Sequence, residues 1–228
     1  MNTLFDMDYE EEKKKNEPLA ARMRPETLQE VVGQKEIIGE GKMLYRMIMA
    51  DRLSSIIFYG PPGTGKTTLA RVIAHSTSSA FFQVNATTAG KKDMENVILK
   101  AKDRMTEKGQ KSILFIDEIH RFNKAQQDYL LPFVEDGTVT LIGATTENPY
   151  FEVNGALLSR SRIFELKPLE TEDLMLLLER AAQDPIKGLG ADSVILDEDA
   201  CHYLAEVADG DARSALNGLE LADLTTEN

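Results

Sequence analysis

The segment 60–67, Gly-Pro-Pro-Gly-Thr-Gly-Lys-Thr, constrains this chain more than any other, because it fits the phosphate-binding pattern G-x-x-x-x-G-K-[ST]. Its glycines allow the backbone to fold around a row of phosphates with N–H groups pointing inward. Lys66 can reach the β- and γ-phosphates, and Thr67 can ligate Mg²⁺. The apolar run 55–59 precedes the loop and helically spaced apolar residues follow it, so we expect a strand before it and a helix N-terminus behind it. This arrangement predicts a nucleoside triphosphate site. The residues expected to bind nucleotide are Gly60, Pro61, Pro62, Gly63, Thr64, Gly65, Lys66, Thr67 and Thr68.

A second acidic motif complements the loop. The apolar run 113–116 ends in Asp117 and Glu118. A strand that ends in adjacent acids places one carboxylate where it can hold Mg²⁺ and the other where it can orient or deprotonate an attacking water. We therefore expect Thr67 and Asp117 to hold the metal and Glu118 to activate water, which predicts a magnesium-dependent nucleoside triphosphatase.

The order of the patterns predicts an α/β fold. Apolar runs alternate with helical patterns up to Pro168, which is typical of a parallel sheet covered by helices. Beyond Pro168 the patterns are all helical. We expect a flexible arm at 1–17, a nucleotide-binding core at 18–167 and a small all-helical domain at 168–228. The further predicted strands are 80–84, 139–144 and 163–166.

Composition excludes several other classes of protein. With 42% hydrophobic and 28% charged residues, the 228-residue chain can bury a good core. The single Cys201 excludes an intramolecular disulfide framework, and the three histidines are too scattered for a zinc site. No long apolar run or signal-peptide core occurs, so the sequence indicates a cytoplasmic protein without a membrane span.

The distribution of charge leaves two interpretations open. A net charge of −12 argues against non-specific coating of nucleic acid. The predicted helix that follows Gly90, however, carries a basic stripe, which is either a solvated face or a nucleic-acid contact. In the arm, the Leu4-Phe5 pair is a candidate docking peptide for a partner such as a replication protein. The basic residues of the stripe are Lys91, Lys92, Lys100, Lys102, Arg104 and Lys108.

Taken together, these motifs resemble an AAA+ ATPase. The segments 115–124, 143–149 and 157–162 look like those of the replication-associated recombination ATPase family called RarA or MgsA, relatives of the clamp loaders. The resemblance runs from about Leu19 to the end of the chain. It implies a five-stranded parallel sheet flanked by helices, in which the strand that carries the sensor 1 residue lies between the P-loop strand and the Asp117 strand, followed by a helical lid.

The resemblance also implies roles for further residues. Thr146 aligns with sensor 1, with Thr145 as a possible shift by one position. Arg160 aligns with the arginine finger that reaches a neighbouring subunit's nucleotide, and Arg213 with sensor 2, which contacts the nucleotide of its own chain. Asn85 resembles the residue that keeps the catalytic glutamate inactive until DNA binds.

The family continues into a helical region associated with tetramer formation, whereas this sequence stops at Asn228, so we expect a fragment of a homo-oligomer. The expected function is that of a DNA-dependent ATPase at single-stranded, gapped or forked DNA, in replication-fork maintenance, recombination and repair, in the nucleoid-associated cytoplasm. The alternatives are a clamp-loader or Holliday-junction motor-like subunit, and a nucleotide-switched scaffold without turnover. A DEAH-type helicase would need a second motor domain, and a small-molecule kinase would leave the helical lid unexplained.

Overall fold

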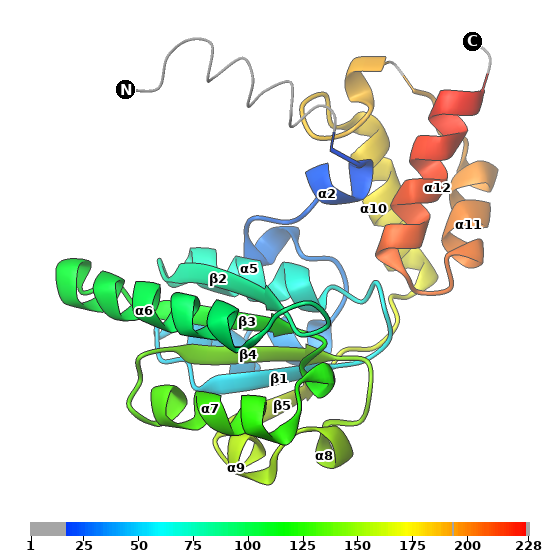
Figure 1. Ribbon diagram of the computed structural model, residues 1–228. Helices are drawn as coiled ribbons and strands as arrows, with labels where there is room; N and C mark the ends of the chain where they lie inside the picture. The colour runs from blue at the N-terminus through cyan, green and yellow to red at the C-terminus, as the bar shows by residue number, and fades with distance from the viewer. Residues whose placement is uncertain (1–16, 193, 227–228) are drawn as a thin grey trace. The chain divides into compact units, whose positions relative to one another are not determined.

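The computed structural model describes residues 17–192 and 194–226, and these form two compact units (Figure 1). One unit is Glu26–Lys167. The other joins the described residues before Glu26 to those from Pro168 onward. Each unit has its own hydrophobic core, so each is described by itself.

The first unit is built on a parallel sheet that has five strands within the described residues. The strand order is β2-β3-β4-β1-β5, as the family resemblance implies, so β4 lies between the P-loop strand β1 and the strand β3 that ends at Asp117. Parallel pairing brings the C-terminal ends of all strands to the same edge of the sheet, where ligands bind in open α/β folds. The strands are β1 (Ser55–Tyr59), β2 (Ala80–Asn85), β3 (Ser112–Asp117), β4 (Thr140–Thr145) and β5 (Ser161–Glu165).

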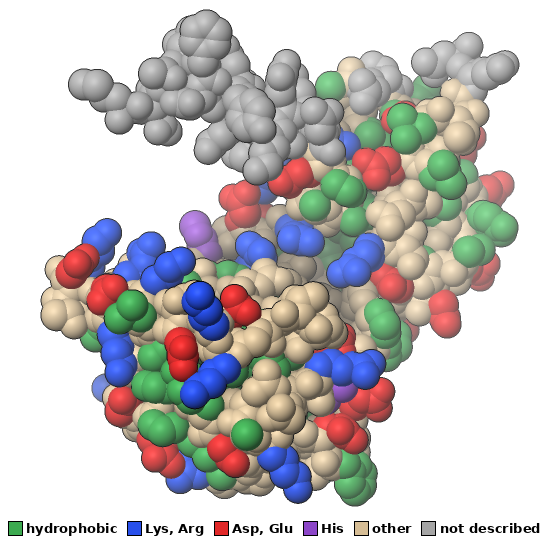
Figure 2. Space-filling view, viewed as in Figure 1, with side chains coloured by type: hydrophobic (Ala, Val, Ile, Leu, Met, Phe, Trp, Pro, Cys, Tyr) green, Lys and Arg blue, Asp and Glu red, His purple; other side chains and the backbone are tan. Residues whose placement is uncertain are grey.

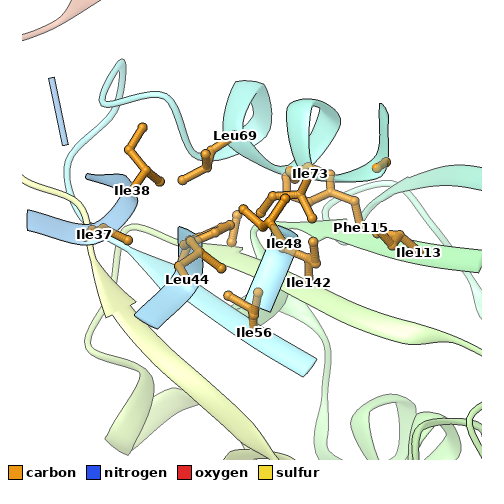
Figure 3. Packing of buried hydrophobic residues seen from close by; sticks show 14 of the residues in the cluster. Ile37, Ile38, Leu44, Ile48, Ile56, Leu69, Ile73, Ile113, Phe115 and Ile142 are labelled. Carbon is orange, nitrogen blue, oxygen red and sulfur yellow. The ribbon is translucent and has the colours of Figure 1, made fainter. Parts of the chain in front are cut away.

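The inner strands are apolar apart from polar residues at their ends, because helices cover both faces of the sheet. Successive side chains of a strand point to opposite faces. In β1, Ile56 and Phe58 accordingly join one core, and Ile57 joins the other. The first core packs β1, β3 and β4 against α3 (Lys35–Ile38), α4 (Met43–Met49) and α5 (Lys66–Ser76), as Figure 3 shows. The second core packs the opposite face against α6 (Lys91–Lys108), α7 (Lys124–Glu135) and α9 (Gly155–Leu158).

Three short helical segments complete the unit. They are η1 (Leu28–Glu30), η2 (Ile119–Arg121) and α8 (Pro149–Glu152). The segment η2 follows β3 directly, and α8 follows β4 after a short turn. Both therefore lie at the C-terminal edge of the sheet, where they shape the loops around the candidate site.

The second unit is helical, as the patterns beyond Pro168 predict. Its main helices are α10 (Thr171–Gln183), α11 (Glu198–Val207) and α12 (Ala212–Thr225), with η3 (Gly190–Asp192) between α10 and α11. Cys201 is 2% exposed within their core. Burial raises the pKa of its thiol, which suits a small core residue and not a nucleophile.

The helix α2 (Leu19–Arg22) belongs to this helical unit, which corrects the predicted start of the nucleotide-binding core at residue 18. Leu19 is fully buried among the residues of the helical core. Its backbone N–H donates to Glu220 Oε1 over 2.8 Å, and the Arg22 guanidinium lies 3.9 Å from the same carboxylate. Segments from the two ends of the described chain therefore fold together, which no local sequence pattern could indicate.

Candidate functional site

The P-loop leaves β1 through Gly60, and its backbone is crowded against the chain that follows β5. A Cβ atom at Gly60 would lie 2.1 Å from the carbonyl oxygen of Leu166, and the φ angle of Gly60 is 148°. Only glycine fits such a position. At the other end of the loop, Gly65 has a φ angle of 95° and precedes the first residue of α5. The two glycines thus deliver the chain from the strand to the helix N-terminus, where N–H groups without helical partners favour anions.

Lys66 is folded back onto this loop. Its ammonium donates to the carbonyl oxygens of Gly60 and Pro61, each over 2.7 Å, and the residue is 8% exposed. The hydroxyl of Thr64 donates to Pro61 as well, over 2.9 Å. Since these partners lie within the loop itself, the charge of Lys66 is already inside the segment predicted to surround the phosphates.

Gln34 ties the N-terminal part of this unit to the loop. Its side-chain amide donates to the carbonyl of Thr64 over 3.3 Å and to that of Lys167 over 2.7 Å, and accepts from the Lys167 N–H over 3.2 Å. No sequence motif assigns a role to Gln34. The available signal is its backbone, which is left-handed (φ 53°) at the N-cap of α3, but an ordinary sequence pattern does not reveal this.

Asp117 and Glu118 stand at the end of β3 as predicted. Asp117 is the last residue of the strand and is paired with Asn85 at the end of β2. Glu118 takes a left-handed conformation (φ 55°, ψ 45°) and is the N-cap residue of η2. A left-handed backbone is uncommon for a residue with a side chain, and such residues are frequent at functional sites.

The carboxylate of Glu118 belongs to a three-residue cluster that sequence reasoning missed. Its Oε2 atom lies 3.3 Å from His120 Nε2, and His120 Nδ1 lies 2.8 Å from the hydroxyl of Thr145. Thr145 is fully buried, and the His120 side chain is 7% exposed. The sequence offers His120 only for a zinc site or a helicase-type motif, because its contact with Glu118 depends on the sheet order.

The cluster also decides which of two neighbouring threonines is connected to the acidic strand. Thr145 is buried at the end of β4, whereas Thr146 is exposed and its side chain makes no hydrogen bond to any described residue. The assignment of Thr146 to sensor 1 stays a prediction. Strand β4 is connected to Glu118 through Thr145, one position earlier, which contacts His120, and His120 in turn contacts Glu118.

Two of the other predicted residues have partners of their own within the described chain. The amide oxygen of Asn85 accepts from the N–H and the hydroxyl of Thr87, over 2.9 and 2.7 Å. Arg160 follows α9 and pairs with Glu135 over 2.6 Å. Arg213 lies at the second position of α12, which is capped by Asp211.

Magnesium fits the donors that this edge of the sheet offers. Thr67 supplies a hydroxyl at the start of α5, and Asp117 supplies a carboxylate at the end of β3. Oxygen atoms are the ligands that Mg²⁺ prefers, and it is usually bound through one or two protein groups plus substrate phosphates. Across residues 17–192 and 194–226, no group of three or more His, Cys, Asp or Glu side chains forms a cage for a metal. A metal shared with the nucleotide is consistent with such a site.

Beside the loop, Tyr59 ends β1 opposite Glu165 of β5. Burial raises the pKa of the Tyr59 phenol, and its hydrogen bond with Glu165 raises it further. Tyr59 therefore remains neutral at physiological pH and adds no charge next to Gly60.

Among the helices that the structure describes, none is both long and apolar enough to cross a bilayer.

Comparison with known proteins points to the same class of protein as the sequence motifs. Residues 56–169 match the family of ATPases associated with various cellular activities, AAA. The chain is 52% identical over 205 residues to replication-associated recombination protein A of Haemophilus influenzae, with 90% of this chain and 46% of that protein covered. The protein of the same name from Bacillus subtilis is 50% identical over 210 residues, with 92% and 49% covered. The chain thus spans about half the length of these curated relatives.

A solved structure is similar in fold as well. The Holliday junction branch migration motor RuvB of Thermotoga maritima superposes with a TM-score of 0.69 at 28% identity, and the alignment covers 87% of this chain and 64% of that one. The chain therefore belongs to the AAA family of ATPases and, within it, to the group of replication-associated recombination protein A.

Proposed function

We propose that this chain is the magnesium-dependent, ATP-hydrolysing module of a DNA-dependent ATPase that acts in replication-fork maintenance, recombination and DNA repair. The name of its relatives, replication-associated recombination protein A, supports the cellular process. Membership of the AAA family supports the reaction. An activity on the chromosome places the protein in the nucleoid-associated cytoplasm.

The observation that carries the proposal is the placement of Glu118. Its carboxylate lies beside His120 at the edge of the sheet where β1 leads into the P-loop. A module that only binds nucleotide has no use for a carboxylate held in this way. A hydrolase needs one, because a positioned base draws a proton from the attacking water.

The remaining groups divide the work of binding. Lys66 and the N–H groups of the loop would hold the phosphates. Thr64 in the loop and Thr68 in the first turn of α5 lie beside them in the sequence. Thr67 and Asp117 would hold Mg²⁺, which when bound neutralises charge on the phosphates. Glu118 would act on water at the γ-phosphate.

Two arginines would supply positive charge at the nucleotide. The Arg160 side chain is 42% exposed beside the edge strand β5, which supports a role at a neighbouring subunit's nucleotide in a homo-oligomer. Arg213 is included on its motif, Gly-Asp-Ala-Arg, as a sensor of the nucleotide bound by its own chain. Asn85 would hold Glu118 in an inactive position until DNA binds.

DNA is the proposed macromolecular partner. The exposed basic residues of α6 support a contact with phosphates, although the helix carries four acidic residues beside its six basic ones. Figure 2 shows the two kinds of charge side by side over this part of the surface. The Leu4-Phe5 pair, proposed to bind replication proteins, lies outside the described residues.

A second candidate function is that of a branch-migration motor, which the similarity to RuvB favours. The two candidates differ in the DNA that should stimulate turnover. A fork-maintenance ATPase should respond to single-stranded, gapped or forked DNA, and a branch-migration motor to four-way junctions.

The test is ATP turnover by the protein that contains this chain, measured with Mg²⁺ and with each of these DNA structures at equal concentration of nucleotides. We expect gapped or forked DNA to stimulate turnover more than a four-way junction or intact duplex. Stimulation by the junction alone would favour the motor. Nucleotide binding without turnover on any DNA would instead support a switched scaffold.

A further inference from the structure

The three-residue cluster that contains Glu118 extends to the P-loop. The carbonyl of Thr145 accepts the N–H of Gly60 over 3.2 Å, while its hydroxyl contacts His120 over 2.8 Å. His120 then reaches Glu118 over 3.3 Å. A continuous set of contacts thus joins the first residue of the phosphate loop to the carboxylate. The contacts run from Gly60, which follows β1, through Thr145 of β4 and His120 of η2 to Glu118, which follows β3.

We propose that His120 and Thr145 are positioning residues that hold the Glu118 carboxylate in register with the P-loop. The inference rests on the proposed role of Glu118 as the base for water. Neither residue touches nucleotide in this proposal. Their action is on the orientation of Glu118 alone.

The hydrogen-bonding groups fit one arrangement of the neutral ring. The Thr145 hydroxyl oxygen already accepts the N–H of Glu147 over 3.0 Å. Its own hydrogen can point to His120 Nδ1, which leaves the ring hydrogen on Nε2, the nitrogen that lies 3.3 Å from the Glu118 carboxylate. The opposite tautomer would set a lone pair of Nε2 against a carboxylate oxygen.

A protonated ring would keep the same contact with Glu118. Both ring nitrogens then carry hydrogen, and the Thr145 hydroxyl can turn its hydrogen to the carbonyl of Glu147, 3.3 Å away. The Nε2 atom of His120 therefore carries a hydrogen beside Glu118 in either state. Thr145 makes this possible because a hydroxyl can both donate and accept.

Burial and backbone geometry explain why such a support is needed. Glu118 has a side chain that is 31% exposed and a left-handed backbone, so neither packing nor secondary structure fixes its carboxylate. The two supporting side chains are almost wholly buried, and Thr145 is held within the sheet. Buried side chains in fixed rotamers are good supports for an exposed catalytic group.

The test compares variants that keep or remove single contacts. Thr145→Val keeps the shape but loses the hydroxyl, and Thr145→Ser keeps the hydroxyl. His120→Ala removes the ring. The matched control is His202→Ala, since His202 is an exposed histidine whose Nδ1 lies 3.7 Å from Glu206 Oε2 in the helical unit. Steady-state kcat and the equilibrium Kd for nucleotide are measured on the full protein.

We expect Thr145→Val and His120→Ala to lower kcat by about 10-fold, less than the ~10²- to 10⁴-fold loss of a general base, with Kd for nucleotide unchanged. Thr145→Ser and His202→Ala should keep the parent kcat. In a Glu118→Gln background, His120→Ala should cause no further loss, because the group that it positions is already gone. A full additional loss there, or equal kcat for the valine and serine variants, would overturn the inference.

A second measurement does not depend on turnover. The imidazole ¹⁵N signals of His120 in the nucleotide-free protein can be assigned by comparing the parent with His120→Ala. The His120 nitrogens should shift in Thr145→Val and in Glu118→Gln, and stay in place in His202→Ala. Unshifted His120 signals in both variants would contradict the contacts. If Glu118→Gln turns over ATP normally, the proposed function of Glu118 fails; if it is inactive while His120→Ala is fully active, only the positioning role fails.

Discussion

Arg160 and Glu135 form an ion pair in which the guanidinium Nη2 lies 2.6 Å from the carboxylate Oε1. The pair connects the chain just after α9 to the last residue of α7. A second guanidinium nitrogen donates to the carbonyl of Ala156 over 2.9 Å. The proposed arginine finger therefore has an acidic partner within its own chain.

The first prediction follows from that pair. Arg160→Ala should lower turnover by about 10³-fold or more without loosening ATP binding, because an arginine finger stabilises charge that develops in the transition state. Mixing it with Lys66→Ala protein should restore part of the activity, since some interfaces then combine an intact finger with an intact loop. An Arg213→Ala protein mixed in the same way should restore none at its own sites. No recovery in mixtures shown to co-assemble would contradict action in trans.

The Glu135 side of the pair can be tested separately. Glu135→Gln removes the charge that holds Arg160 and should keep or raise turnover in the assembled protein. The pair is half exposed and contributes little to stability, about 0–1 kcal/mol. A large loss of turnover with unchanged stability would mean that Glu135 itself takes part in the reaction.

A second prediction concerns the base. Glu118→Gln should bind ATP with the parent affinity and hydrolyse it about 10²- to 10⁴-fold more slowly. The matched control is Glu107→Gln, an exposed acid on α6, which should leave kcat unchanged. Single-turnover hydrolysis and an equilibrium nucleotide titration measure the two quantities, and near-parent turnover in Glu118→Gln would remove Glu118 from the mechanism.

Lys66 should behave differently from Glu118. Lys66→Ala removes the only charge-bearing side chain that donates to the Gly60 and Pro61 carbonyls among the described residues, so nucleotide affinity itself should fall. A loss of about 10-fold or more in Kd corresponds to at least ~1.4 kcal/mol. Because Lys66 is buried, a thermal melt must show that the variant is folded. Equal affinity of a folded Lys66→Ala protein for ATP would exclude a phosphate contact.

The structure shows which basic residues of α6 are suited to test the predicted contact with nucleic acid. The Lys102 ammonium lies 5.0 Å from the centre of the Phe133 ring and the Arg104 guanidinium 5.9 Å from that of Phe82, so both cover the protein's own aromatic side chains. Lys92 and Lys100 are exposed and form no ion pair or hydrogen bond with the described residues.

Lys92 and Lys100 are therefore the better probes. Changing both to Glu should weaken DNA binding and flatten the slope of log affinity against log salt by roughly one unit for every phosphate that the protein no longer neutralises. Each of the two changes is also made alone and compared with Lys124→Glu, on α7, as the control for net charge. An unchanged salt slope would indicate that the basic residues of α6 form a solvated helix face and do not contact DNA.

A stability prediction concerns Asp184 at the end of α10. Its Oδ1 accepts the N–H groups of Ile186 and Lys187 over 2.8 and 2.9 Å. The N–H of Lys187, with that of Ile186, lowers the pKa of Asp184 below its usual value of 3.8. Asp184→Ala should destabilise the helical unit by about 1–2 kcal/mol at pH 7, whereas Asp184→Asn keeps the acceptor and should lose less.

The pH dependence of this contribution has a definite sign. A carboxylate whose pKa is lower in the folded state stabilises the protein above its unfolded pKa, and the contribution disappears as pH falls through the folded pKa. The difference in unfolding free energy between the parent and Asp184→Ala should therefore shrink below about pH 3.8. Urea unfolding of both proteins at several pH values measures it, and a difference that grows in acid would contradict the assignment.

Much of the fold could be predicted because the inner strands are mostly short apolar runs, each of which ends at a polar residue or glycine. Ile113 to Ile116 shows this: the run predicts a buried strand, and Asp117 marks its end at the candidate site. The position of β4 between β1 and β3 came from the family resemblance alone. A local pattern carries no information on which strands are neighbours.

The details of the site were less predictable for physical reasons. Whether Thr145 or Thr146 reaches His120 depends on the exact residue at which β4 ends, since successive side chains point to opposite faces of the sheet. His120 acquires its proposed role from a contact between the ends of two strands, and Leu19 is fixed by a contact with a helix 201 residues away. Such long-range contacts leave no periodicity in the sequence.

The strand order has a consequence for how the protein is made. The P-loop strand finds both of its partners late in the chain, since Ile56 pairs with Ile142 on one side and with Arg162 on the other. During synthesis the loop therefore leaves the ribosome well before the strands that will hold it. Such non-local pairing slows folding, because the entropy of closing long loops is lost before the contacts form. Nascent chains that end before β5 should not retain ATP, so the ability to bind nucleotide is acquired only once the last strand of the sheet has emerged.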